Sequence, residues 1–190
     1  ISVIISNNTS ASHGGGLSIK DLQDYTLSGI TLTNNTASGG SGGGIYISES
    51  EFSLINTYFE DNSVLWYGGG IFISQSTSLC SVDSSTFISN DAGEWGGAMY
   101  FTGSENLNVS NSLFYSNTAS YGAGVAFWQG ENEDQYFTNN TFGWNTAAQE
   151  GSAIHVQNGY NIHVTNSIFW GNSENYVIKM GVASATTELS

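Results

Sequence analysis

The chain has 190 residues, of which 39% are hydrophobic and 9% are charged, with sixteen acidic residues against two lysines. This hydrophobic content is sufficient for a core and excludes a globally disordered chain. The net charge of −14 excludes nucleic acid and anionic membrane surfaces as partners, because binding to phosphate requires lysine or arginine. No window holds the roughly 18 apolar residues that would span a bilayer, so we expect no direct membrane insertion.

Taken in order, the chain repeats a unit of 27 or 28 residues. Most units carry the motif Phe-x-x-Asn, then a glycine-rich triplet, and then an apolar-x-apolar segment. The asparagines of the successive units, which we call the ladder asparagines, are Asn8, Asn35, Asn62, Asn90, Asn117, Asn145 and Asn172. Self-similarity at a fixed period of this length indicates a repeat protein.

Two strands are predicted in each unit. One carries mostly apolar residues ten and eight positions before the ladder asparagine, which is the period of two of a strand with one buried face. These strands fall at 25–27, 52–54, 80–82, 107–109, 135–137 and 162–164. The other strand follows the glycine triplet, at 17–19, 45–47, 71–73, 99–101, 125–127 and 154–156. Adjacent glycines and β-branched residues argue against helices here.

An apolar residue also recurs three positions before each ladder asparagine. In the later units it is a phenylalanine, at Phe59, Phe87, Phe114, Phe142 and Phe169. If successive units pair in register, about 4.8 Å apart, each residue lies over its counterpart in the next unit. We therefore expect an internal aromatic stack and, beside it, a ladder of hydrogen-bonded amides from Asn35 to Asn172.

These patterns predict an all-β parallel β-helix of about six to seven coils, with 27–28 residues per coil. The repeat domain is expected to cover residues 1–175, and residues 176–190 to form a partial coil or tail. A β-propeller or an antiparallel sandwich is the alternative, but propeller blades usually need about 40 residues. Open coil ends expose strand edges that can pair with another chain, so we expect a homo-oligomer or fibre.

Two motifs carry a resemblance to known proteins. They are FEDN at Phe59–Asn62, with its counterparts in other coils, and GGGI at Gly42 and Gly68. Together they resemble the repeat of the polymorphic membrane protein family of surface adhesins. The segment Asn166–Asn172, NSIFWGN, resembles the coil motif of large secreted right-handed β-helix proteins. The resemblance implies a right-handed β-helix, extracellular or on the cell surface, that serves in adhesion or as a scaffold.

No catalytic, metal or cofactor set is expected. Lyases of this fold resemble one another in using an arginine or lysine base, whereas this chain has no arginine and its two lysines lie near its ends. Hydrolysis needs a pair of carboxylates on one face, and the acids here scatter over different positions of the repeat. The densest acidic cluster, Glu131–Asp134, lacks the alternating pattern of a calcium loop, so a solvated loop is favoured over a weak calcium site.

The three histidines and the single cysteine are expected to have structural and not catalytic roles. His13, His155 and His163 occupy different positions of the repeat and are expected at the surface. Cys80 falls in an inward column and is expected to pack as a small hydrophobic residue.

Glycosylation sequons are candidates for modification. The sequence Asn-x-Ser/Thr occurs at Asn7, Asn34, Asn108 and Asn139, and at the ladder residue Asn8. Asn34 and Asn108 are expected to face solvent. Asn139 shares a column with Asn56, Asn111 and Asn166 that is expected to face inward, which would make it a poorer acceptor.

Aromatic residues also recur at outward positions. Tyr46, Phe72 and Tyr100 are expected to stack on three successive coils, with Tyr67, Trp95 and Tyr121 near the next corner. Such a stripe can bind sugar rings or a partner, or it can merely stabilise the solenoid. The first functional hypothesis is a non-enzymatic structural or adhesive module that self-associates end to end. The alternative is a carbohydrate-binding or carbohydrate-active protein that uses these aromatic residues and surface acids.

Overall fold

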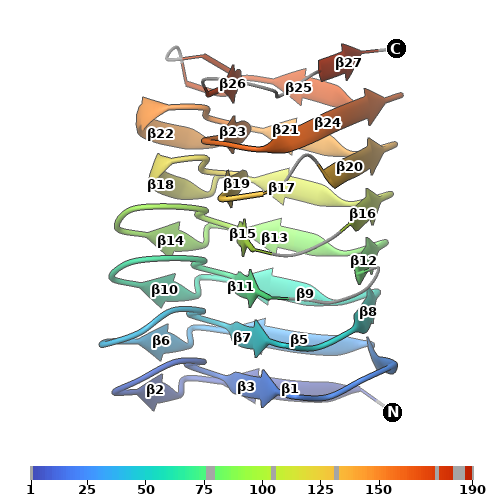
Figure 1. The fold of residues 1–190 in the computed structure, drawn as a ribbon. Coiled ribbons are helices and arrows are strands. Elements are labelled where there is room, and N and C mark those ends of the chain that lie inside the picture. The colour runs from blue at the N-terminus through green and yellow to red at the C-terminus, as the bar shows by residue number, and fades with distance from the viewer. Residues whose placement is uncertain are drawn as a thin grey trace.

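The computed structural model describes residues 2–75, 80–103, 106–130, 133–173, 176–181 and 187–189. The chain winds into a solenoid whose coils stack along one axis, from β1–β4 at one end to β26 and β27 at the other (Figure 1). All the strand pairs within its four sheets are parallel, and each joins a strand to its counterpart in the next coil. The predicted fold class, a parallel β-helix, is confirmed.

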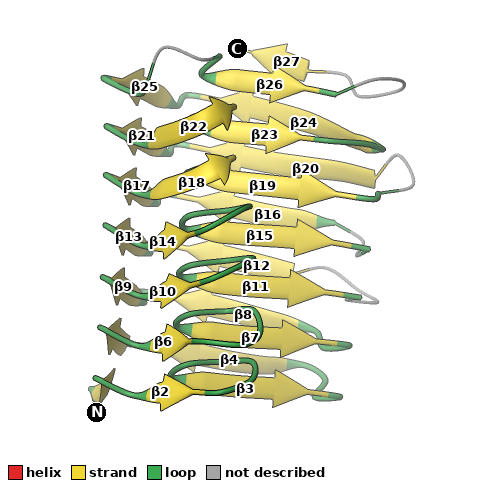
Figure 2. Ribbon diagram, turned by 90° about the vertical axis from the view of Figure 1, so that its left-hand side faces the viewer, coloured by secondary structure: helices red, strands yellow, loops and turns green. Residues whose placement is uncertain are grey.

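We name the four sheets A to D. Sheet A contains β1 (Val3–Ser6), β5 (Ile30–Thr33), β9 (Tyr58–Glu60), β13 (Thr86–Ile88), β17 (Leu113–Tyr115), β21 (Thr141–Gly143) and β25 (Ile168–Trp170). Sheet B contains β2 (Thr9–Ser10), β6 (Thr36–Ala37), β10 (Ser63–Val64), β14 (Asp91–Ala92), β18 (Thr118–Tyr121) and β22 (Thr146–Glu150). Sheet B follows each ladder asparagine, and its strands lengthen in the last two coils (Figure 2).

Sheets C and D follow the glycine-rich triplet, which forms a turn that we call the glycine corner. Sheet C contains β3 (Leu17–Lys20), β7 (Ile45–Ser48), β11 (Ile71–Ser74), β15 (Met99–Thr102), β19 (Val125–Trp128), β23 (Ile154–Val156) and β26 (Ile178–Met180). Sheet D contains β4 (Tyr25–Ser28), β8 (Phe52–Ile55), β12 (Cys80–Asp83), β16 (Leu107–Ser110), β20 (Glu133–Thr138), β24 (Tyr160–Thr165) and β27 (Thr187–Leu189). Strands β26 and β27 pair with β23 and β24, so the stack continues beyond residue 175.

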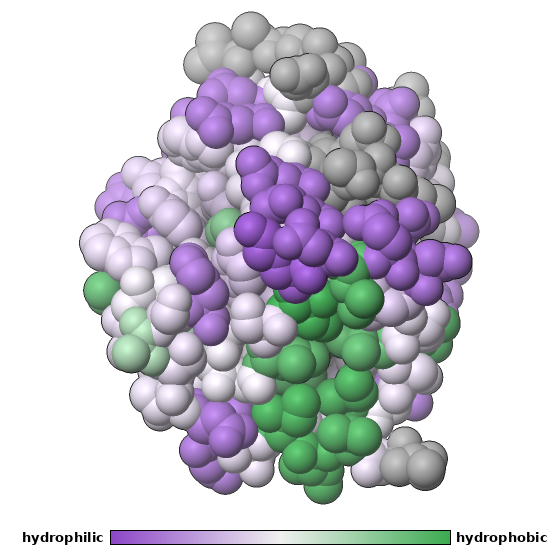
Figure 3. Space-filling model, turned by 60° about the horizontal axis from the view of Figure 1, so that its bottom comes forward, coloured by the Kyte–Doolittle hydropathy of each residue, from purple (hydrophilic) through white to green (hydrophobic). Residues whose placement is uncertain are grey.

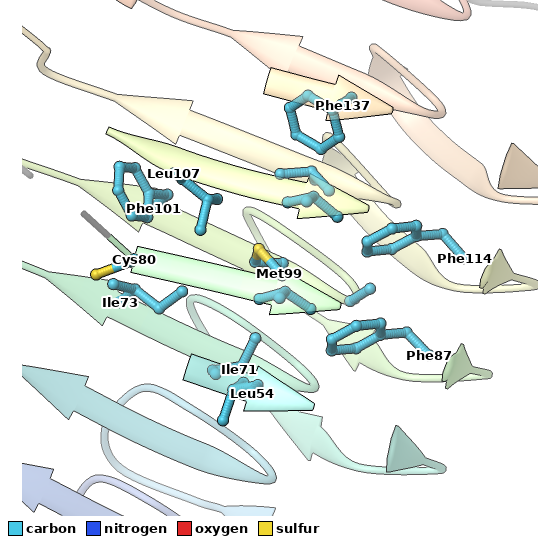
Figure 4. Packing of buried hydrophobic residues seen from close by; sticks show 14 of the residues in the cluster. Leu54, Ile71, Ile73, Cys80, Phe87, Met99, Phe101, Leu107, Phe114 and Phe137 are labelled. Atoms are coloured by element: carbon cyan, nitrogen blue, oxygen red, sulfur yellow. The ribbon is translucent and has the colours of Figure 1, made fainter. Parts of the chain in front are cut away.

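The phenylalanines of sheet A form a continuous stack in the core. Phe59, Phe87, Phe114, Phe142 and Phe169 lie ring over ring, with centroids 4.6–5.0 Å apart and planes within 6° of parallel. Phe87 and Phe114 lie beside the aliphatic residues of the other sheets in the same cluster (Figure 4). The stack follows from the pairing register, which places each ring directly over the next.

The ladder asparagines lie beside this stack, and from Asn35 to Asn145 their side-chain amides are hydrogen-bonded to the coils before and after them. In Asn90, Oδ1 accepts hydrogen bonds from the backbone N and from Nδ2 of Asn62, at 3.1 and 3.0 Å. Its Nδ2 donates to Asn117 Oδ1 at 3.1 Å and to the carbonyl of Phe59 at 3.0 Å. The same pattern recurs from Asn35 to Asn145, so one buried side chain per coil satisfies turn backbone that would otherwise be orphaned.

A second polar ladder, between sheets D and A, was not predicted. Its members lie five residues before the ladder asparagines, and they are Thr57, Ser85, Ser112, Asn140 and Ser167. From Ser85 onward, each side chain accepts a hydrogen bond from the backbone N of the corresponding residue in the preceding coil, at 2.9–3.2 Å. The sequence carries a signal for this ladder, since the column is polar in every one of these coils.

The residues just before the second ladder correct one prediction. Asn56, Asn111, Asn139 and Asn166 do not face inward but are exposed, with φ between +48° and +58°. Asparagine tolerates this left-handed conformation better than most residues. The column therefore consists of turn residues that direct the following side chain into the core.

The glycine corner owes its composition to close contact between backbones. A Cβ on Gly69 would lie 2.3 Å from the carbonyl oxygen of Gly97 and 2.6 Å from that of Asp91. Its predecessor Gly68 has a φ of +70°, which other residues rarely adopt. The triplet thus meets two separate requirements, one of conformation and one of space.

Candidate functional site

Sheet C presents a column of aromatic side chains on its outer face. Strand pairing places Tyr46 beside Phe72, Phe72 beside Tyr100, and Tyr100 beside Ala126. The rings of Tyr46 and Phe72 stack with centroids 5.1 Å apart, and those of Phe72 and Tyr100 with centroids 5.3 Å apart. The column arises because side chains at equal positions of neighbouring strands contact one another.

A second row of aromatic residues, Tyr67, Trp95 and Tyr121, lies at the corner before sheet C. Parallel β-bridges join Tyr67 to Trp95 and Trp95 to Tyr121. The Tyr67 ring stacks on the Tyr100 ring at 5.1 Å, and the Trp95 ring stacks on the Tyr121 ring at 4.5 Å. The corner row therefore packs against the column on sheet C.

The column is interrupted at Ala126, whose methyl group takes less space than the rings in the coils before it. Trp95 and Trp128 pack against the cluster of Phe72, Tyr100 and Ala126, and Ala126 is fully buried. The two indole rings lie 5.0 Å apart and are nearly perpendicular, at 81°. The small side chain thus admits tryptophans from two neighbouring coils.

A cleft of about 450 Å³ lies among these side chains. We call it the aromatic cleft, and its lining residues are Tyr67, Phe72, Glu94, Trp95, Tyr100, Thr102, Trp128 and Gln129. The volume is in the range of small-molecule binding sites, which combine apolar walls with a few polar groups. Rings in the walls can stack on the apolar face of a sugar, and the polar side chains can bond its hydroxyl groups.

The tyrosines of the cleft are held in their neutral form. Burial, assisted by the charge of Glu94 and a hydrogen bond to it, raises the pKa of Tyr67. Burial likewise raises the pKa of Tyr100 well above its usual range. Both phenols therefore keep their hydroxyl protons at neutral pH and can act as hydrogen-bond donors.

Several predicted surface residues are in fact covered. Phe72 and Tyr100 point outward, as expected, but they are only 8% and 5% exposed because the corner row and Trp128 pack over them. His155 was expected at the surface and is 1% exposed. Its ring contacts Trp95 edge-on at 4.9 Å, and its Nε2 lies 3.2 Å from Gln157 Oε1.

The buried His155 should make stability depend on pH. Burial lowers the pKa of His155 below 6.5, its value in an unfolded chain, so the unfolded chain binds more protons just below that pH. The stability that neutral His155 contributes is present above about pH 6.5 and is lost as the pH falls through the folded-state pKa. We expect His155→Phe to lose less stability than the wild type between pH 7.5 and 5.5 in urea unfolding. Equal losses would contradict this assignment.

Two residues of the cleft were not singled out from the sequence. Trp128 ends strand β19, and its backbone carbonyl accepts a hydrogen bond from Thr102 Oγ1 at 2.6 Å. Glu94 precedes Trp95 in the corner. The sequence carries a weak signal in both cases, since Glu94 directly precedes Trp95 and Trp128 stands two residues after Ala126, the outward position of the same strand.

The sequons have different surroundings. Asn7, Asn34 and Asn139 are exposed at turns with φ between +55° and +58°. Asn108 lies on the outer face of sheet D but is only half-exposed, with its Oδ1 buried. Asn34 is thus a more accessible acceptor than Asn108.

The described residues contain no group of three or more His, Cys, Asp or Glu side chains that could hold a metal ion. Of the acidic cluster Glu131–Asp134, the first two residues lie outside the described part of the chain. Asp134 is 2.9 Å from His163 Nε2, and its pKa is lowered by hydrogen bonds to His163 and Asn161. Cys80 is buried on β12.

The in-register stacking of four parallel sheets defines a β-helix protein, here with an aromatic cleft on one face. The chain belongs to the family described as the right handed beta helix region, which it matches over residues 2–142. No curated protein matches the sequence. Within the described residues, no helix is long and apolar enough to cross a membrane.

Proposed function

We propose that the chain is a non-enzymatic carbohydrate-binding module of an extracellular or cell-surface protein, and that it contributes to adhesion. The observation that carries this proposal is the aromatic cleft, in which five aromatic residues surround a space of about 450 Å³. Aromatic rings suit sugar recognition because they pair with the apolar face of the ring, while hydroxyl groups at its rim need polar partners. Thr102 and Gln129 supply such partners.

The absence of catalysis is also part of the proposal. Glycoside hydrolysis generally uses two carboxyl groups flanking the scissile bond. Glu94 is the one carboxylate among the described residues that line the cleft. This composition supports binding without cleavage.

Substitution of the tryptophans tests the proposal. We expect Trp128→Ala to weaken the binding of a recognised oligosaccharide by about 30-fold, the loss typical of an aromatic residue at the centre of a binding site. Trp95→Ala should have a similar effect. Binding is measured by isothermal titration calorimetry against ligands found on a glycan array.

Trp144→Ala is the matched control. Trp144 is 48% exposed, follows β21 on sheet A and does not line the cleft, so its substitution should leave binding unchanged. Circular dichroism should show that each variant remains folded. Equal losses in Trp144→Ala and Trp128→Ala, or no binding to any glycan, would overturn the proposal.

A second candidate function is assembly through the coil ends. The end formed by β1–β4 shows an apolar surface (Figure 3), and Val3 and Ile4 on β1 are 44% and 68% exposed. Core residues of this coil, among them Leu17 and Ile19, are only partly buried. We propose that a second copy stacks on this surface, since unpaired strand edges and apolar side chains favour such pairing.

Sedimentation velocity tests the second candidate. We expect elongated oligomers to increase with protein concentration, and Leu17→Lys to reduce them by placing a charge in the contact. A similar charge far from this end, in Ile88→Lys on the outer face of β13, should leave assembly unchanged. A monomer at all concentrations would contradict assembly through the coil ends.

A further inference from the structure

We propose that the aromatic cleft selects a positively charged saccharide, an amino sugar with a free ammonium group. This inference rests on the proposed carbohydrate-binding function and adds the charge of the ligand. It is carried by the placement of Glu94 among five aromatic rings, in a chain that offers no cation there.

Among the described residues, the charged side chain that lines the cleft is negative, and no lysine lies there to balance it. The chain has two basic residues other than histidine, Lys20 and Lys179, and neither lines the cleft. Each is paired elsewhere, Lys20 with Glu49 and Lys179 with Glu150, both at 3.2 Å. An anionic sugar would therefore meet the Glu94 carboxylate and a net charge of −14 without compensation, whereas a cation is attracted by both.

The aromatic walls favour a cation for a second, independent reason. An ammonium group within about 6 Å of a ring centroid is attracted by the negative face of the ring, most strongly for tryptophan. Trp95 and Trp128 meet at 81° with centroids 5.0 Å apart, and Tyr67 and Tyr100 lie against the same space. Rings that stand at right angles can surround a cation on more than one side.

The carboxylate can bond such a ligand directly. Glu94 interacts with the Tyr67 hydroxyl, which occupies part of its acceptor capacity. An ionised carboxylate has two oxygens and about four acceptor sites, so it can also accept an ammonium N–H. Charge-assisted hydrogen bonds of this kind are about twice as strong as neutral ones.

Three β-1,4-linked hexamers test the inference, because they share a backbone and differ at one position of the sugar. They are the hexamers of glucosamine, N-acetylglucosamine and glucose, and a hexamer of galacturonic acid serves as the anionic probe. At pH 6 and low ionic strength we expect the glucosamine hexamer to bind about tenfold more tightly than either uncharged hexamer. Its affinity should fall with added salt, and the anionic hexamer should not bind.

Glu94→Gln should remove this preference, so that the glucosamine hexamer no longer binds more tightly than the two uncharged hexamers. Glu60→Gln is the control, because it removes the same charge on sheet A, outside the cleft. Equal binding of charged and uncharged hexamers by the wild type, or equal effects of the two substitutions, would overturn the ammonium preference while leaving the proposed function intact. Failure of all four hexamers and of a general glycan array to bind would overturn both.

Discussion

Replacing Asn90 with alanine is expected to destabilise the fold by about 3–5 kcal/mol. The substitution removes the acceptor for the backbone N–H and the Nδ2 of Asn62, and the donor to the carbonyl of Phe59. Asn90 and Asn62 are completely buried, so water cannot replace these bonds. Each buried polar group that loses its partner costs about 1–3 kcal/mol.

Urea unfolding followed by circular dichroism measures this effect, with Asn56→Gly as the control. Asn56 is an exposed turn residue with φ of +52°, which glycine adopts without strain. Its substitution should change stability by no more than about 0.5 kcal/mol. Similar losses in the two variants would show that the buried position of the ladder amide is not what stabilises the coils.

Replacing Phe87 with alanine is expected to cost about 3–5 kcal/mol through lost burial and the cavity left behind. Phe87 is fully buried between Phe59 and Phe114, with ring centroids 4.7 and 4.9 Å away. The effect should extend beyond local packing, because each coil of a solenoid contacts only its neighbours and the stack joins them. We expect the thermal transition to broaden as the two halves become less strongly coupled.

Phe87→Leu serves as the graded variant, since leucine keeps much of the buried volume and should lose about half as much stability as alanine. Differential scanning calorimetry gives both the midpoint and the cooperativity of unfolding. A transition as high and as sharp in Phe87→Ala as in the wild type would contradict the role of the stack.

Residues at equal positions of the repeat lie over one another, as the sequence predicts, wherever the backbone of the coil alone sets the direction of the side chain. Phe87 lies over Phe59 because both stand three residues before a ladder asparagine in strands that pair in register. The same logic would have found the second polar ladder, since Ser85 and Ser112 occupy one column. The interpretation of Asn139 was wrong because the turn before this ladder takes positive φ, which shifts the inward position by one residue.

The cleft could not be predicted in the same way. An outward position on a strand is exposed only if no other segment covers it, and Tyr100 and His155 are covered by side chains from a corner and from a strand end. Trp95 and Trp128 come from neighbouring coils and different positions of the repeat. Their contact depends on the lateral packing of side chains, which no periodicity records.

The sequence by itself thus determined the coil, its period, the aromatic stack and the amide ladder, because in-register pairing turns each recurring position into a line of contacts along the axis. The tertiary structure alone decided which outward residues are buried and where a cleft remains. The reason is that packing across the outer surface brings together residues from different positions of the repeat. The space beside Ala126, for example, is filled by Trp95 and Trp128, which come from two different coils.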